Sequence, residues 1–159
     1  MTDQAVNPNL RVACIVPTYN GRKELERLLD SLERQSASFD LFIVDSSSQD
    51  GTAELARARV PGVVSIPSSQ FNHGGTRQMM VGANPGYDIY VFLTQDAYLE
   101  DSEAIEHLLA PFSDEQVGAV CGRQLPHLDA TPMAQHARLF NYSATSQVKA
   151  LEDVPEPVS

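Results

Sequence analysis

The sequence predicts an α/β domain with a mostly parallel sheet and flanking helices. Short apolar runs rich in valine, isoleucine and phenylalanine alternate with segments of helical periodicity, a pattern typical of βαβ units. Polar residues follow the runs at once, as expected where buried parallel strands end in loops. The chain has 159 residues, of which 42% are hydrophobic, enough for one domain with a buried core.

Five apolar runs are expected to form strands. They cover residues 12–16, 41–44, 63–66, 89–93 and 117–121. Right-handed crossovers place the second and third strands to one side of the first. If the fourth strand returns to the other side, a crevice opens between the first and fourth strands, where ligands of open α/β sheets bind.

Helices are expected between these strands and after them. They cover 24–35, 52–59 and 76–83, and two more begin at 102 and 131. In the first, leucines recur at the spacing of an amphipathic helix: Leu25, Leu28, Leu29 and Leu32. We interpret residues 1–10 as a flexible lead, 11–145 as the folded domain and 146–159 as an acidic, proline-rich tail.

Composition excludes several classes of protein. The net charge is −10, from 11 basic and 21 acidic residues, so nucleic acid is not an expected partner. No apolar run approaches the ~20 residues of a membrane helix, and the first residues lack the apolar core of a signal peptide. Cys14 and Cys121 are the only cysteines, which argues against a disulfide framework and fits a reducing cytoplasm.

Two acids stand where expected strands end. Asp45 follows the second run and Asp96 the fourth, while Thr18 follows the first. The carboxyl ends of parallel strands share one edge of a sheet, and a carboxylate there needs a hydrogen bond, a counter-charge or a metal. We therefore predict a ligand site at this edge. The alternatives are that Asp45 bonds its own serine-rich loop and that Asp96 caps the next helix.

A glycine pair opens the helix expected at 76. Bare N–H groups of Gly74 and Gly75 at a helix N-terminus favour phosphate, and Arg77 could add a bidentate positive charge. His73 could contact phosphate or metal. The alternative is a tight turn with a solvated arginine and a structural histidine.

Four segments together resemble inverting family 2 glycosyltransferases of the GT-A fold. Residues 12–20 (VACIVPTYN) resemble the opening strand and loop of that family, and 44–52 (VDSSSQDGT) its second-strand acidic loop. Residues 71–77 (FNHGGTR) and 92–97 (FLTQDA) are similar to bacterial rhamnosyltransferases in particular. The resemblance extends over about residues 11–125, most of the chain.

The resemblance implies that the domain binds a nucleotide-diphospho-sugar such as dTDP-L-rhamnose. The residues that it assigns to the donor are Pro17, Thr18, Tyr19, Asp45, Gly74, Arg77, Gln95 and Asp96. Asp96 falls at the metal-binding acid of the DxD motif, which implies Mg²⁺ or Mn²⁺ as cofactor. Thr94 replaces the first acid of that motif, so one carboxylate remains.

The implied reaction is sugar transfer with inversion to a polysaccharide or glycolipid acceptor, in the cytoplasm or at the inner face of the membrane. The family's acceptor half supplies the catalytic base after a Gly-Gly-aromatic segment, which this sequence lacks, so no base is assigned and the chain reads as truncated. Glu152 and Asp153 are interpreted as solvated tail residues. A face left uncovered by a missing half would favour self-association.

Three other functions stay open. The chain could be a non-catalytic module that binds a nucleotide-sugar or a partner protein. It could be a nucleotidyltransferase, although PTYNGRK after the first strand is a poor match to the glycine-rich, basic loop of those enzymes. A phosphoacceptor receiver domain would need a lysine after a late strand, where Gly122 and Arg123 stand instead.

Overall fold

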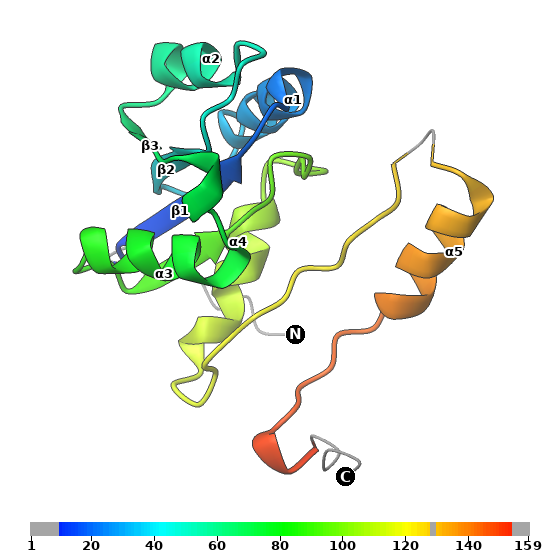
Figure 1. The fold of residues 1–159 in the computed structure, drawn as a ribbon. Coiled ribbons are helices and arrows are strands. Elements are labelled where there is room, and N and C mark those ends of the chain that lie inside the picture. The colour runs from blue at the N-terminus through cyan, green and yellow to red at the C-terminus, as the bar shows by residue number, and fades with distance from the viewer. Residues whose placement is uncertain (1–9, 128–129, 154–159) are drawn as a thin grey trace, which may run out of the picture. The chain divides into compact units, whose positions relative to one another are not determined.

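The computed structural model describes residues 10–127 and 130–153. They belong to two compact units, Met1–Gly118 and Ala119–Ser159. The first unit contains a four-stranded sheet in the order β3-β2-β1-β4 (Figure 1). Its strands are β1 (Val12–Thr18), β2 (Asp40–Asp45), β3 (Gly62–Ser65) and β4 (Ile89–Phe92), and all neighbours run parallel. The predicted parallel sheet is confirmed, with β4 on the far side of β1.

Helices cover both faces of this sheet. The first unit holds α1 (Arg22–Leu32), α2 (Thr52–Arg59), α3 (His73–Ala83) and α4 (Ala104–Leu109), with single 3₁₀ turns at Ser68–Gln70 and Ala110–Ser113. Figure 1 shows α1 and α2 on one side of the sheet and α3 on the other.

Side chains of β1 alternate between two cores. Cys14 and Val16 pack with the leucines of α1 and with Ile105 of α4, whereas Ile15 packs with Met80 of α3. A strand buried on both faces gives a continuous apolar run, as the sequence shows. Burial raises the pKa of the Cys14 thiol to about 12, so this cysteine is no nucleophile at neutral pH.

The α3 face is covered less completely than the other. Phe92 at the end of β4 is 44% exposed, and Met79 of α3 is 42% exposed. Val64 of β3 is also exposed. An uncovered face left by a missing half, and self-association through it, stay predictions.

Two expected boundaries are wrong at the site edge. The strand that was expected to stop before Pro17 continues to Thr18. The carbonyl of Ile15 accepts from Leu93 N, and the backbone of Pro17, two residues later, faces the same side of β1, toward β4. The pairing with β4 ends before Pro17, so the missing N–H of this proline breaks no ladder bond. The helix expected from 76 begins at His73, because the side chain of Asn72 accepts from Gly75 N and caps it.

The prediction of a strand over 117–121 is also wrong. These residues form no strand, although their composition of valine, alanine and cysteine suits one. Strand propensity is expressed only where a neighbouring strand offers a ladder, and the sheet of the first unit ends at β3 and β4.

The second unit contains the expected helix after residue 131. This helix, α5, spans Pro132–Asn141, and the Thr131 hydroxyl caps it by accepting from Ala134 N. Met133 and Phe140 are exposed, and a short 3₁₀ turn follows at Leu151–Asp153. The predicted domain boundaries at 10 and 145 stay predictions. Within the described ranges, no helix has the length and apolarity needed to cross a bilayer.

Candidate functional site

The carboxyl ends of β1 and β2 meet in register. Thr18 and Asp45 are opposite each other in the parallel ladder, and their side chains are buried. Pro17, one residue earlier, is half-buried opposite Val44. Tyr19 follows β1 as an exposed residue, and Gln95 and Asp96 follow β4 on the neighbouring strand. The sheet therefore places these predicted site residues along one edge.

The Asp45 carboxylate organises the loop that follows it. Its Oδ1 accepts from the Thr18 hydroxyl at 3.2 Å and from the Ser48 hydroxyl at 2.6 Å, and its Oδ2 accepts from Ser48 N at 2.9 Å. The alternative that Asp45 bonds its own serine-rich loop is confirmed. A carboxylate offers about four acceptor positions, and three of them are used here.

The start of α1 is tied to its neighbours by side chains. Four consecutive backbone N–H groups each donate to a side chain from another loop. The pairs are Tyr19 N to Gln95 Oε1 (2.8 Å), Asn20 N to Ser48 Oγ (2.9 Å), Gly21 N to Thr52 Oγ1 (3.0 Å) and Arg22 N to Asp50 Oδ2 (3.2 Å). Three of these donors belong to the loop before α1 and the fourth is the first N–H of the helix, so these four groups are not free to bind a phosphate.

Two residues beside these bonds adopt left-handed backbone conformations. Asn20 has a φ of 43° and Ser47 a φ of 63°, which residues other than glycine rarely adopt. Asn20 Oδ1 accepts from Gln49 N at 2.9 Å, and Ser47 Oγ donates to the Ile66 carbonyl at 2.9 Å. Strained conformations that side chains hold in this way cluster at functional sites.

The Asp96 carboxylate is the group available to a metal at this edge. It is exposed, in a turn closed by the bond from Ala97 N to the Thr94 carbonyl, and it has no hydrogen-bond or ion-pair partner among the described residues. Within those residues, no three histidines, cysteines or acids gather into a metal site. The donor chemistry of a single carboxylate suits Mg²⁺ or Mn²⁺ when ligand oxygens complete the shell.

Residues of α3 reach the end of β4. The Arg77 guanidinium donates to the His73 carbonyl at 2.7 Å and lies 6.0 Å from the ring centre of Phe92. Of the predicted glycine nest, Gly75 N is taken by the cap at Asn72, while Gly74 is exposed with open space around its Cα. The structure thus brings Arg77 beside β4 and leaves Gly74 as the open part of the nest.

Sequence reasoning missed the side chains that hold these loops together. Ser48, Asp50 and Thr52 are not among the predicted site residues, yet each accepts a backbone N–H from the start of α1 or the loop before it. Ser46 was missed as well: its hydroxyl is buried and has no hydrogen-bond partner among the described residues. The run of small hydroxyl residues from Ser46 to Thr52 was the available signal, since such side chains bond backbone at turns.

The hydrogen bonds that Asp50 accepts make this part of the site sensitive to acid. The Thr52 hydroxyl, and then the N–H groups of Arg22 and Thr52, lower the pKa of Asp50 below its usual 3.8. A lowered pKa adds stability that is present above pH 3.8 and is lost as the pH falls through the folded value. We expect Asp50→Asn to lower stability at pH 7, by an amount that shrinks below pH 3.8. Urea unfolding of the wild type and of Asp50→Asn across this pH range measures the difference in stability. A difference in stability that is constant with pH would contradict the lowered pKa of Asp50.

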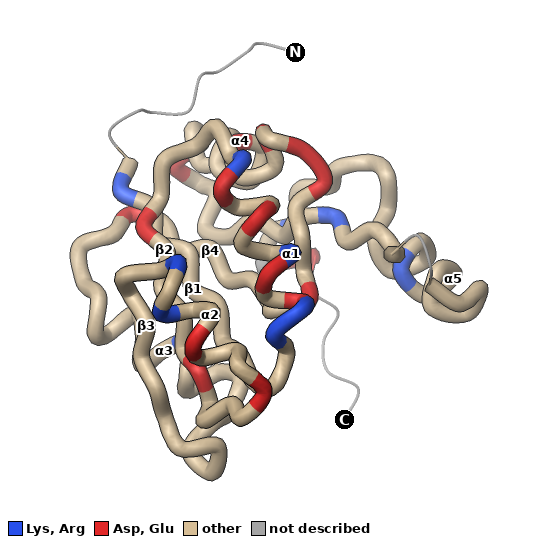
Figure 2. Tube along the Cα trace, turned by 90° about the horizontal axis from the view of Figure 1, so that it is seen from above, with Lys and Arg blue, Asp and Glu red and all other residues tan. Residues whose placement is uncertain are grey.

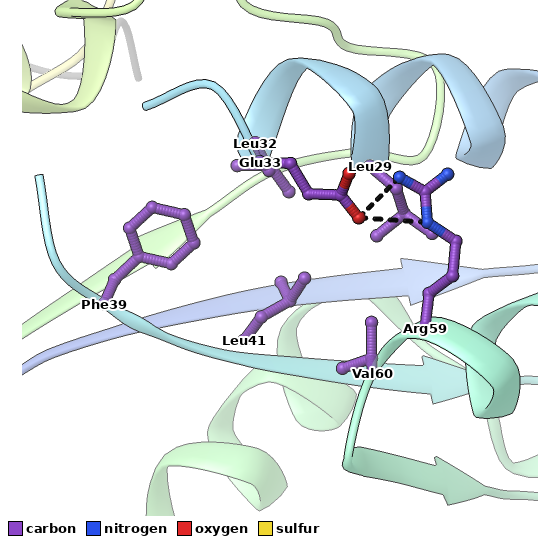
Figure 3. Close-up of a pocket in the computed structure, with 7 residues that line it drawn as sticks. All are labelled: Leu29, Leu32, Glu33, Phe39, Leu41, Arg59 and Val60. Atoms are coloured by element: carbon purple, nitrogen blue, oxygen red, sulfur yellow. Dashed lines mark hydrogen bonds and ion pairs between the residues drawn. The ribbon is translucent and has the colours of Figure 1, made fainter. Parts of the chain in front are cut away.

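A separate cavity lies at the other end of β2. It has a volume of about 180 Å³ and is lined by Leu29, Leu32, Glu33, Phe39, Leu41, Arg59 and Val60 (Figure 3). Arg59 and Glu33 form an ion pair of 2.6 Å at its rim. Because Leu41 lies near the start of β2 and Asp45 ends the strand, this small apolar cavity is not part of the candidate site.

Acidic residues predominate along the chain. Acids outnumber basic residues by 21 to 11 along the chain, and Figure 2 shows acidic positions on α1, on α2 and around α4. Such a surface does not attract nucleic acid. A negatively charged ligand would depend on local cations such as Arg77 or on a bound metal.

Comparison with known proteins shows the family of the chain. A family model described as "Glycosyl transferase family 2" matches residues 13–155. The O-antigen chain rhamnosyltransferase RfbN of Salmonella typhimurium is 46% identical over 147 residues, 91% of this chain and 47% of that protein. The O-antigen chain rhamnosyltransferase WbaN of Salmonella anatum is 44% identical, over 88% of this chain and 45% of that protein. The chain spans about half the length of these curated relatives.

Solved structures agree with the fold. A mannosyltransferase from Pyrobaculum calidifontis, PcManGT, in complex with GDP-Man and Mn²⁺, matches with a TM-score of 0.64 at 24% identity. The match covers 77% of this chain and 39% of that one. The resemblance seen in four sequence segments is thus confirmed by a family match over most of the chain and by the arrangement of the sheet. The chain belongs to the family 2 glycosyltransferases and has their GT-A fold.

Proposed function

We propose that this domain binds dTDP-L-rhamnose in the crevice between β1 and β4. The observation that carries the proposal is the shared edge at which Thr18, Tyr19, Asp45, Gln95 and Asp96 meet in a member of this family. The names of the two Salmonella relatives support rhamnose as the sugar. The whole enzyme would transfer it, with inversion, to a polysaccharide or glycolipid acceptor on the cytoplasmic side of the membrane.

Each residue has a proposed task that follows from its geometry. The exposed ring of Tyr19 stacks on the nucleobase, while the remaining acceptor position of Asp45 takes a nucleoside N–H or hydroxyl. Arg77, beside the end of β4, offsets charge on the diphosphate. Asp96 would hold Mg²⁺ or Mn²⁺, which supplies charge compensation as the diphosphate leaves.

Sugar transfer needs an acceptor and a catalytic base, and we propose this step only for the whole enzyme. Transfer needs a base within about 2.6–3.2 Å of the acceptor hydroxyl, or one water away. Asp45 is engaged by Thr18 and Ser48, and Asp96 has the proposed metal task. Asp153, in the second unit, accepts from Ala150 N in an exposed turn. We therefore propose that residues 10–118 supply donor recognition, and we assign none of them as the base.

The metal task of Asp96 is directly testable. Isothermal titration of the 159-residue chain with dTDP, with and without Mn²⁺, should show tighter binding in the presence of the metal. We expect Asp96→Asn to abolish that enhancement and to leave binding without metal nearly unchanged, because the amide has lost the anionic oxygen that a hard cation prefers.

The matched control is Glu100→Gln, which removes an exposed acid from the same segment. Equal metal enhancement in wild type and Asp96→Asn would rule out Asp96 as the metal ligand. Absence of dTDP binding by the wild-type chain, with or without metal, would overturn the proposed function.

A further inference from the structure

The side chain of Gln95 joins the ends of β1 and β4. Its Oε1 accepts from Tyr19 N at 2.8 Å, and its Nε2 donates to the Tyr19 carbonyl at 3.0 Å. The two residues are 76 positions apart in the sequence. Both polar atoms of one carboxamide are therefore used by the backbone of a single residue, which fixes the position and the orientation of that residue.

Gly21 leaves the space in which this carboxamide lies. A Cβ added to Gly21 would lie 2.2 Å from Gln95 Nε2 and 2.5 Å from Gln95 Cδ. The φ of Gly21, −141°, is not in the left-handed region that favours glycine, so the role of glycine here is to leave room for the Gln95 carboxamide. The contact makes the placement of Gln95 dependent on a residue two positions after Tyr19.

The ring of Tyr19 is exposed while its backbone is fixed. It is 53% exposed and has no hydrogen bond or ring contact among the described residues. The backbone is held by Gln95 on one side and by the bond from Asn20 N to Ser48 on the other. An aromatic ring that projects from a rigid backbone at a ligand-binding edge is suited to stack on a base.

We propose that Gln95 is a positioning residue for donor recognition and that it acts through Tyr19. It holds the Tyr19 backbone so that the ring stands where the nucleobase stacks, and it makes no contact with the ligand. Both polar atoms of its carboxamide already bond the Tyr19 backbone, whereas the family resemblance had placed Gln95 among the ligand contacts. This inference rests on the proposed function, because it assumes a nucleoside at Tyr19.

Four proteins test the inference: wild type, Gln95→Ala, Tyr19→Ala and the double variant. Binding of dTDP and of pyrophosphate, both with Mn²⁺, is measured by calorimetry. We expect Gln95→Ala to weaken dTDP binding about tenfold, the size of one stacking contact, and to leave pyrophosphate binding within about twofold. In the Tyr19→Ala background, the same change should alter dTDP binding less than about twofold, because the ring through which Gln95 acts is gone.

Gly21→Ala is an independent probe of the same contact. The added methyl group displaces the Gln95 side chain, so the affinity for dTDP should fall about as far as in Gln95→Ala. In the Gln95→Ala background the clash is absent, and Gly21→Ala should have little further effect. If Gln95→Ala does not fold, Gln95→Glu preserves the size and the acceptor for Tyr19 N, and it should give a smaller loss of the same selectivity.

The outcomes separate the two proposals. A wild-type chain that does not bind dTDP overturns both the proposed function and this inference. Binding by wild type that is unchanged in Gln95→Ala overturns the inference alone. So does an equal loss in the Tyr19→Ala background, which would show direct contact with the ligand, or an equal loss for pyrophosphate, which would show a general structural role.

Discussion

Asp45→Ala is expected to weaken dTDP binding by at least about tenfold, because a lost hydrogen bond to a charged group is worth about 1.5–3 kcal/mol. The carboxylate also shapes the site before any ligand arrives. Without it, the hydroxyls of Thr18 and Ser48 and the N–H of Ser48 lose their buried acceptor. Pyrophosphate binding should change little, since Asp45 faces the nucleoside in the proposed complex.

Asp45→Asn is the matched control for this change. Asparagine keeps one oxygen for the hydroxyls of Thr18 and Ser48, but its NH₂ group faces Ser48 N–H, where the carboxylate accepted a bond. An intermediate loss of dTDP affinity is therefore expected, measured by calorimetry at constant salt. If dTDP and pyrophosphate weaken alike in Asp45→Ala, the residue serves the fold or the metal and does not bind the nucleoside.

Leu28→Ala is expected to destabilise the domain by about 2–5 kcal/mol. Leu28 lies on α1 with no exposed surface and belongs to the core that α1, α2 and α4 form on the sheet. Removal of its buried methyl groups loses transfer free energy and leaves a cavity in closely packed surroundings. Because domains are stable by only about 5–15 kcal/mol, this change takes a large share of the total.

Glu26→Ala, on the exposed face of the same helix, is the control. It should change the free energy of unfolding by less than about 0.5 kcal/mol, as surface substitutions usually do. Urea unfolding followed by far-ultraviolet circular dichroism compares the variants. A loss below about 1 kcal/mol in Leu28→Ala would mean that α1 is not anchored as the structure shows.

The strands near the site could be predicted because burial on both faces leaves a clear trace in the sequence. Cys14, Ile15 and Val16 form one uninterrupted apolar run although their side chains enter two different cores. The acid that follows β2 and the one that follows β4 then mark the edge at which a ligand binds. The order of the strands followed from the handedness of crossovers and from the assumed return of β4.

The contacts that shape the site could not be predicted in the same way. The bonds between Gln95 and Tyr19 join residues 76 positions apart and leave no periodic pattern. Gln95 was selected through family resemblance, which does not say whether a residue contacts the ligand or positions a neighbour. The segment at 117–121 shows the opposite error, since its composition suits a strand but no strand of the sheet pairs with it.

The order of the strands has a consequence for folding. β1 lies between β2 and β4, so its two edges are paired by segments that leave the ribosome at different times. Thr18 and Asp45 are 27 residues apart, and Tyr19 and Gln95 are 76 apart, so the second closure costs roughly 1 kcal/mol more in chain entropy. We therefore expect the β1–β2 pair to form first with α1, and β4 to dock onto it afterwards. On this order the pairing of β1 with β4, beside the candidate site, is the last part of the sheet to form, and until then the open edge of β1 is the part of the nascent chain most exposed to mispairing.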